Sequence, residues 1–205
     1  GLNCPIEKYS SKDFSKGQIR TLNYILSNSH NNKNVYLLIN NKLNIDVMNI
    51  LYRAMLLNID VNKYTTGEYT AEQLNIIING LIEKLPVNLY DKPEYTANKM
   101  NLLYLMIRNK FYEDNINYDE FDSGQLMEIY TGYLAHVDVH LYMNPKFSVL
   151  QMRQLRIGQL NGLEISSYSD PSLRYDEMKL KRVTLENERN NDRYEEIAHF
   201  LKNLE

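Results

Sequence analysis

The sequence predicts an all-α fold, an α-solenoid of about seven helical repeats of 26 residues. Each repeat is expected to be one long helix plus one short helical turn. The main observation is a pair of residues five positions apart, an aromatic or leucine followed by Met, Leu or Ile. The pairs are Phe14/Ile19, Leu43/Met48, Tyr69/Leu74, Tyr95/Met100, Phe121/Leu126, Phe147/Met152 and Leu173/Met178. The first step is 29 residues and every further step is 26, a period typical of stacked helical units that share one core.

This period predicts a single repeat domain over 1–205. Its units lie near 6–34, 35–60, 61–86, 87–112, 113–138, 139–164 and 165–190, with a C-terminal capping helix over 191–205. The seventh unit is interpreted as a capping repeat, because Lys181, Thr184 and Arg189 stand where the other units carry apolar residues.

The sixth unit shows most clearly how each long helix begins. Ser148 is expected to cap the helix while Gln151, at the third helical position, returns to the Ser148 backbone N–H. Phe147 and Met152 flank this capping box as a hydrophobic staple. The same box recurs at Ser15/Gln18, Thr70/Gln73 and Asp122/Gln125, and Asn44 and Thr96 supply caps without the glutamine. The repeated Gln-Met pair is therefore interpreted as structural.

Apolar residues three, seven and eleven positions after the Met predict a buried stripe on a helix of about 12 to 15 residues. Six positions after the Met the residue is often small, as in Ala54, Gly80, Gly132 and Gly158. Because glycine costs a helix about 1 kcal/mol, we expect a neighbouring helix to approach closely there. Apolar residues three apart before each cap, as in 139–142, predict a short helical turn rather than a strand.

One stretch resembles a known repeat. Residues 151–158 read Gln-Met-Arg-Gln-Leu-Arg-Ile-Gly, and residues 162–168 read Gly-Leu-Glu-Ile-Ser-Ser-Tyr. They resemble the Phe-x4-Gln-Met-x2-Ile-Arg-x-Gly repeats, with a trailing Gly-Leu-x-Val-Ser-x-Tyr, of uncharacterised Firmicutes proteins, some of them on mobile elements. The match covers 139–190 and is only patterned elsewhere. The resemblance implies a helical repeat and a low-GC Gram-positive source, and the family has no established activity to transfer.

Composition narrows the class of function. No Gly-rich phosphate loop and no nucleophile with a plausible base occurs, so we expect neither an enzyme nor a cofactor. His136, Asp138 and His140 offer too few converging ligands to predict a metal site. No apolar run approaches the roughly 18 residues of a membrane span. The chain begins at Gly1 rather than Met, which suggests upstream trimming; we favour the cytoplasm and leave export open.

The position just after each Met is expected to point away from the core. It holds Arg20, Asn49, Asn75, Asn101, Met127, Arg153 and Lys179. The asparagine row, which we define as Asn49, Asn75 and Asn101, could hold an extended peptide backbone because an amide donates and accepts at once. Arg153 and Lys179 are predicted to continue this binding face. The first hypothesis is therefore a non-catalytic scaffold for an unknown protein or peptide; the alternative is an ordinary solvated face.

Two charged regions suggest other partners. A nucleic-acid-associated accessory protein of a mobile element could use the basic residues near the C-terminus, Arg153, Arg156, Arg174, Lys179, Lys181, Arg182 and Arg189. The net charge of −3 and the dispersed basic residues argue against general nucleic-acid binding. Residues 113–138 hold seven acidic residues and no Lys or Arg, a local charge of −7. They are interpreted as a solvated acidic segment or a docking patch for a basic partner.

Overall fold

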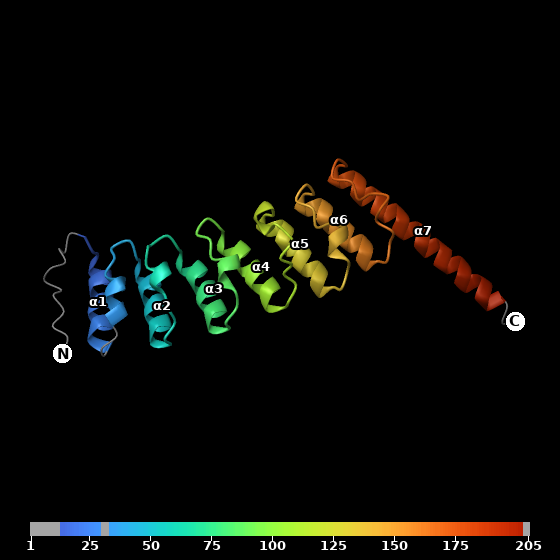
Figure 1. Ribbon diagram of the computed structural model, residues 1–205. Coiled ribbons are helices and arrows are strands. Elements are labelled where there is room, and N and C mark those ends of the chain that lie inside the picture. The colour runs from blue at the N-terminus through green and yellow to red at the C-terminus, as the bar shows by residue number, and fades with distance from the viewer. Residues whose placement is uncertain (1–12, 30–32, 203–205) are drawn as a thin grey trace. The chain divides into compact units, whose positions relative to one another are not determined.

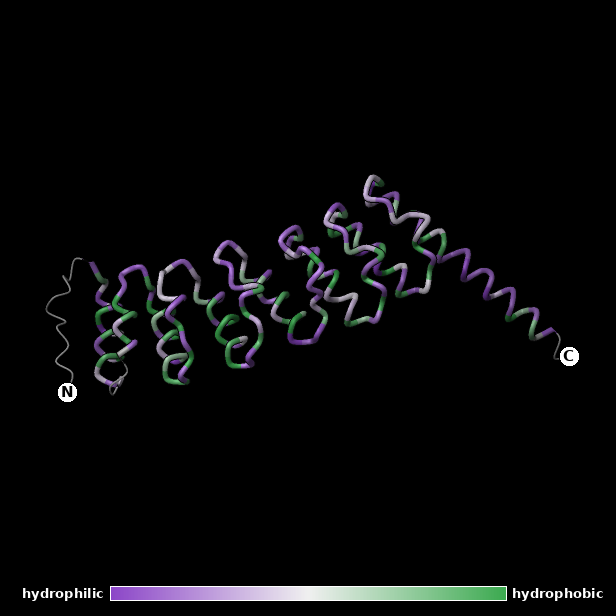
Figure 2. The backbone as a smooth tube through the Cα atoms, in the orientation of Figure 1, coloured by the Kyte–Doolittle hydropathy of each residue, from purple (hydrophilic) through white to green (hydrophobic). Residues whose placement is uncertain are grey.

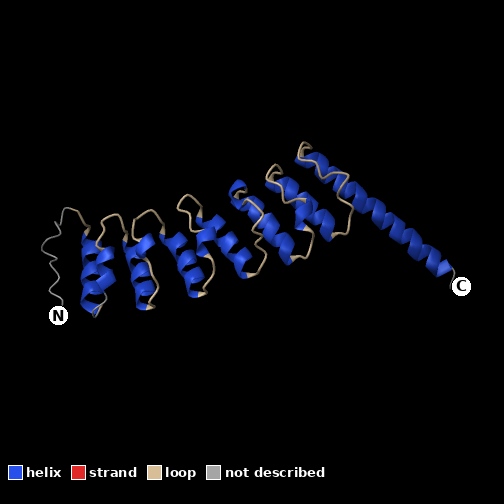
Figure 3. Cartoon of the chain, viewed as in Figure 1, coloured by secondary structure: helices blue, strands red, loops and turns tan. Residues whose placement is uncertain are grey.

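The computed structural model describes residues 13–29 and 33–202, where all regular structure is helical (Figure 3). This confirms the predicted all-α class. The chain divides into two compact units, 1–108 and 109–205. A single repeat domain over 1–205 is predicted, and the 26-residue register itself runs through the boundary unchanged, from Met100 to Leu126. The division falls instead where the connection between two long helices departs from the repeat.

In the first unit, consecutive long helices pack against one another in series, α1 on α2, α2 on α3 and α3 on α4 (Figure 1). The elements are α1 (Lys16–Asn28), η2 (Lys33–Leu38), α2 (Ile45–Leu56), η3 (Asn62–Tyr64), α3 (Ala71–Ile82), η4 (Val87–Leu89) and α4 (Ala97–Arg108). The η elements are short 3₁₀ turns. The helices of 12 or 13 residues match the predicted length.

The second unit repeats this packing, α5 on α6 and α6 on α7. Its elements are η5 (Tyr118–Glu120), α5 (Ser123–Leu134), η6 (Val139–Leu141), α6 (Val149–Leu160) and α7 (Tyr175–Lys202). The predicted separate capping helix over 191–205 is wrong for its described part, because α7 continues unbroken to Lys202. No Gly or Pro occurs between 175 and 202 to end it. Residues 203–205 lie outside the described residues.

The predicted helix caps are confirmed. Complete capping boxes start α1, α3, α5 and α6, and Asn44 and Thr96 accept hydrogen bonds from the third backbone N–H of α2 and α4. Arg174 provides no cap, but Glu177 still accepts from the Arg174 N–H at 2.8 Å. Most staple residues are buried, with Met48, Met100 and Met152 fully inaccessible to solvent, while Phe14, Ile19 and Leu173 are half-buried.

Each box glutamine has a second role that the capping pattern does not predict. The Nε2 of Gln151 donates to the carbonyls of Pro171 and Leu173, at 3.1 and 2.6 Å, in the connection that leads to α7. Gln18, Gln73 and Gln125 bond the next connection in the same way. The glutamine therefore holds the starts of two consecutive helices side by side, which makes those helices parallel.

The glycines six positions after the Met accommodate a tyrosine hydroxyl rather than a neighbouring helix. A Cβ added to Gly80 or Gly158 would overlap the hydroxyl of Tyr90 or Tyr168, ten residues further on. Gly132 and Tyr142 form a third such pair. The prediction that a neighbouring helix approaches these glycines is thus wrong. The group that approaches is the tyrosine ring of the short turn that follows the same helix.

The connection that contains η5, over 109–122, departs from the other connections. The elements η3, η4 and η6 lie at the predicted turns, and 166–168 form a plain turn. In contrast, η5 begins at Tyr118, later than the register predicts. Glu113 occupies the place of the usual valine, and its side chain accepts from the Tyr133 hydroxyl. The Phe111 ring stacks on Tyr133 at a centroid distance of 4.9 Å. Aromatic packing therefore replaces the usual turn at the start of the second unit.

Candidate binding surface

The asparagine row lies on the first unit, with one residue on each of α2, α3 and α4. Asn75 and Asn101 are exposed, and Asn49 is half-buried. Over residues 13–29 and 33–202, none of the three side-chain amides has a hydrogen-bond partner within the chain. Their donors and acceptors are therefore open to solvent or to a ligand.

An apolar side chain follows each of the first two asparagines by seven residues. Seven residues are close to two helical turns, so both side chains lie on the same helix face, about 10 Å apart along the axis. Leu56 is 57% exposed and Ile82 is 51% exposed. We name these two residues the apolar row. On α4 the corresponding residue is Arg108, whose Nε lies 2.9 Å from Glu83.

Acidic side chains stand at the other end of this face. Asp46 and Glu72 are exposed in the first turns of α2 and α3, where a negative charge favours the helix N-terminus. The face of α2 and α3 therefore runs from a carboxylate through an amide to a hydrocarbon side chain, and on α2 the exposed Arg53 lies between Asn49 and Leu56. Together these residues form a surface that can bind both polar and apolar groups.

Arg153, which the sequence predicts as a binding residue, is engaged inside the second unit. Its Nε donates to Glu128 at 2.8 Å, and the Arg156 Nε donates to the other carboxylate oxygen at 2.9 Å. The Glu128 side chain is only 4% exposed, so two guanidinium groups from α6 neutralise a carboxylate buried on α5. The interpretation of Glu128 as part of a solvated or docking acidic patch is wrong. Lys179 is exposed and contacts no charged partner in the described chain.

Most other basic residues of the C-terminal region also bond within the unit. The partners are Asp176 for Arg174, Ser167 for Lys181, Gln154 and Glu186 for Arg182, and the Asn161 carbonyl for Arg189. Arg182 and Arg189 connect α7 to α6 through Gln154 and Asn161. Among the basic residues proposed for nucleic acid, the carboxylates of Glu128, Asp176 and Glu186 compensate part of the positive charge, while Lys181 and Arg189 bond only to neutral carbonyls.

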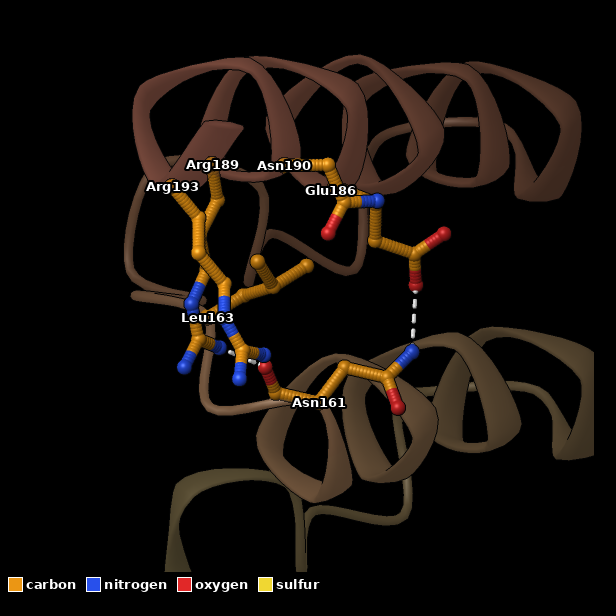
Figure 4. A pocket seen from close by; sticks show the side chains of 6 residues that line it. All are labelled: Asn161, Leu163, Glu186, Arg189, Asn190 and Arg193. Carbon is orange, nitrogen blue, oxygen red and sulfur yellow. Dashed lines mark hydrogen bonds between the residues drawn. The ribbon is translucent and has the colours of Figure 1, made fainter. Parts of the chain in front are cut away.

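A pocket of about 350 Å³ opens where α6 ends beside α7 (Figure 4). It is lined by Asn161, Leu163, Glu186, Arg189, Asn190 and Arg193. Arg189 donates to the Asn161 carbonyl at the C-terminus of α6, where a cation is favourable. The Asn161 amide donates to Glu186 at 2.6 Å. Arg193 has no hydrogen bond or ion pair with any residue in the described ranges, so its guanidinium is available.

A buried polar cluster in the first unit was not predicted. Asp91 is 6% exposed and accepts from the Tyr64 hydroxyl at 2.8 Å and from Lys63 at 2.6 Å. Its backbone carbonyl accepts from the Tyr69 hydroxyl at 2.6 Å. Burial, with the Asp91 carboxylate nearby, raises the pKa of Tyr69 to about 12 and that of Tyr64 further. The sequence feature that could have predicted this cluster is Asp91 itself, an acid at a repeat position that holds Thr65, Met143 and Ser169 in other units.

The two histidines of the connection between α5 and α6 do not converge. His136 ends α5 in the left-handed conformation with φ of 56°, and the Asp138 side chain accepts from the His140 backbone N–H. The His140 ring lies 3.4 Å from Glu113. No group of three or more His, Cys, Asp or Glu side chains with metal-binding geometry occurs in the part of the chain that the structure describes.

Comparison of the chain with family models, curated proteins and solved structures finds no match. Among the described helices, none is both long and apolar enough to cross a membrane.

Proposed function

We propose that this chain is a non-catalytic scaffold that binds an extended peptide or protein segment across the exposed face of α2, α3 and α4. The observation that carries the proposal is the recurrence of an open amide and an exposed apolar side chain seven residues apart on α2 and α3. Amides bond to a peptide backbone, and hydrocarbon side chains favour contact with apolar ones. Because the two carboxylates Asp46 and Glu72 outnumber the one cation, Arg53, on this face of α2 and α3, a basic ligand fits it better than an acidic one.

The proposal includes the predicted arrangement of the repeats as a solenoid. Seven units stacked as one α-solenoid would present such faces in a continuous series, as repeat scaffolds do. The 26-residue register and the parallel glutamine-linked helices within each unit support it. The resemblance to Firmicutes helical repeats stays a prediction consistent with this architecture.

The nucleic-acid alternative has less support. Arg153, Arg156 and Arg182 bond to Glu128, Gln154 and Glu186 within the second unit. Glu128 and Glu186 therefore compensate two of these three positive charges before any ligand binds. Binding to a mixed-sequence duplex that falls steeply between low and physiological salt would favour this alternative.

Panning a displayed peptide library on the full chain tests the proposal. We expect enriched peptides that combine basic and apolar residues, and we expect their binding to fall at least about tenfold in the triple variant Asn49→Ala, Asn75→Ala, Asn101→Ala. Leu56→Ser with Ile82→Ser should weaken the same peptides. The matched control is Met127→Ala, at the same register on α5 in the second unit. Peptides that bind the triple variant as tightly as the parent chain would refute the proposal.

A further inference from the structure

The face of α7 that contacts α6 continues beyond α6 as an exposed face that ends in two apolar side chains, Ile197 and Phe200. Along α7 this face runs through residues spaced three or four apart, Arg182, Glu186, Arg189, Arg193, Ile197 and Phe200. The first three bond to α6 or its C-terminal turn. Ile197 is 48% and Phe200 63% exposed. Within this unit α7 extends well past α6, and its last turns alternate hydrophilic and hydrophobic residues (Figures 1 and 2).

The same face of α7 carries both a pocket and an exposed phenylalanine, Phe200, whose ring would fit a pocket of that size in a second copy. The pocket described above, beside Arg189 and Arg193, is large enough for a phenyl ring. Phe200 lies seven residues after Arg193, close to two helical turns along the same face. An arginine guanidinium binds favourably over an aromatic ring. A twofold axis perpendicular to two antiparallel helices would place each Phe200 in the pocket of the other copy, the self-complementary arrangement of a symmetric dimer.

Charge complementarity selects this antiparallel register. Asn190 lines the pocket, so Phe200 of one copy is placed opposite Asn190 of the other. In this antiparallel register, the numbers of any two opposed residues add to 390. Arg193 then lies opposite the partner's Ile197 and beside the partner's Glu196. Arg193 has no bonded partner among the described residues, and the twofold axis creates this contact two times. The charge of Arg193 would therefore be neutralised in both copies. In a parallel pair, the Arg193 side chains of the two copies would face each other, and like charges repel.

We propose that α7 pairs in antiparallel orientation with α7 of a second copy of this chain, and that the Phe200 ring of each copy occupies the pocket between α6 and α7 of the other. In this register the paired segment runs from Glu188 to Lys202, which is about 21 Å at the helical rise per residue. An interface of this length is small, so the dimer forms in a concentration-dependent way.

Sedimentation equilibrium of the full chain over a wide concentration range tests the proposal. We expect a monomer–dimer equilibrium that Phe200→Ala weakens by at least about tenfold. Leu163→Ala, a change in the pocket wall outside α7, should weaken it as well. Tyr194→Ala is the matched control, because Tyr194 is 72% exposed but lies beside the pairing face. It should alter the dimer constant by less than Phe200→Ala does.

A charge exchange tests the register. Arg193→Glu and Glu196→Arg should each disfavour the dimer, because like charges then meet across the axis. Mixing the two variants should restore a heterodimer, and the double variant should restore the homodimer. Circular dichroism of each variant verifies that the helices are intact. A chain that stays monomeric at the highest concentrations, or a dimer that Phe200→Ala and the charge variants leave unchanged, would overturn the proposal.

Discussion

The two units place residues in the same repeat register but join their helices with different chemistry. In the first unit, positions 28 residues apart on α3 and α4 hold Ile76 and Tyr104. The same positions on α5 and α6 hold Glu128 and Arg156, which are bonded at 2.9 Å. One step further, Gln154 accepts from Arg182 at 2.9 Å. The comparison teaches that the repeat determines where two helices meet, while the side chains there can be apolar or ionic.

Apolar and ionic contacts between helices differ in how much stability a substitution costs. Apolar side chains of similar volume replace one another at modest cost, because hydrophobic contact is non-directional. A buried carboxylate requires its partners, since removing one leaves an uncompensated charge. The second unit is therefore expected to be the more sensitive to single substitutions between its helices.

The largest expected effect is at Glu128. Glu128→Ala should lower the free energy of unfolding by about 3 to 5 kcal/mol, because Arg156 loses its buried counter-charge. Ile76→Ala in the first unit should cost less, since Ile76 is only half-buried. Chemical denaturation of both variants measures the difference.

A transplanted pair sharpens the same comparison. The double variant Glu128→Ile with Arg156→Tyr carries the first unit's side chains at the second unit's positions. Replacing a buried ion pair by apolar residues of similar volume is often neutral or stabilising, so it should recover most of the stability that Glu128→Ala loses. If the double variant is as unstable as the single one, the two interfaces are not interchangeable.

The second effect concerns the glycine–tyrosine pairs. Gly158→Ala should cost about 1 to 3 kcal/mol, because the new Cβ overlaps the Tyr168 hydroxyl. Adding Tyr168→Phe removes that hydroxyl and should restore most of the loss in thermal unfolding. The first unit already carries Ala54 ten residues before Tyr64, whose hydroxyl bonds to Asp91 instead. Additive costs in the double variant would contradict this account.

The third effect compares two buried tyrosine hydroxyls. Tyr64→Phe should cost about 1 to 3 kcal/mol, because it removes a hydrogen bond to buried Asp91. Tyr168→Phe should be near neutral, since its hydroxyl has no hydrogen-bond partner among the described residues. Urea denaturation of the two variants side by side measures both. Equal losses would mean that ring packing, and not the hydroxyl, determines the cost.

The last effect is a dependence on alkaline pH, which is absent at neutral pH. Burial raises the pKa of Tyr168 to about 12, against an ordinary value of 10.0, with Arg182 opposing the shift. The folded chain thus holds this proton more tightly, so its contribution is fully present below pH 10 and is lost as pH rises from about 10 to about 12. Tyr168→Phe should reduce the fall in unfolding free energy over this range by up to about 1.4 kcal/mol per pH unit. An unchanged slope would show that other tyrosines dominate.

Local patterns predicted the helices well, because their physics is local. A cap such as Ser148 and its glutamine lie three residues apart, so the chain can be read for them without knowledge of the fold. The candidate site was predicted only in part. The asparagine row follows from helical spacing, but the engagement of Arg153 by Glu128 spans 25 residues and requires the packing of two helices.

The sequence by itself determined the helical class, the 26-residue register, the caps and the buried staple residues. Only the tertiary structure decided which polar side chains are bonded and which are open. It also showed that the glycines make room for tyrosine rings and that α7 continues beyond its neighbour. The physical reason is that periodicity specifies which face of a helix is buried, while the identity of the group across that face depends on residues 10 to 28 positions away.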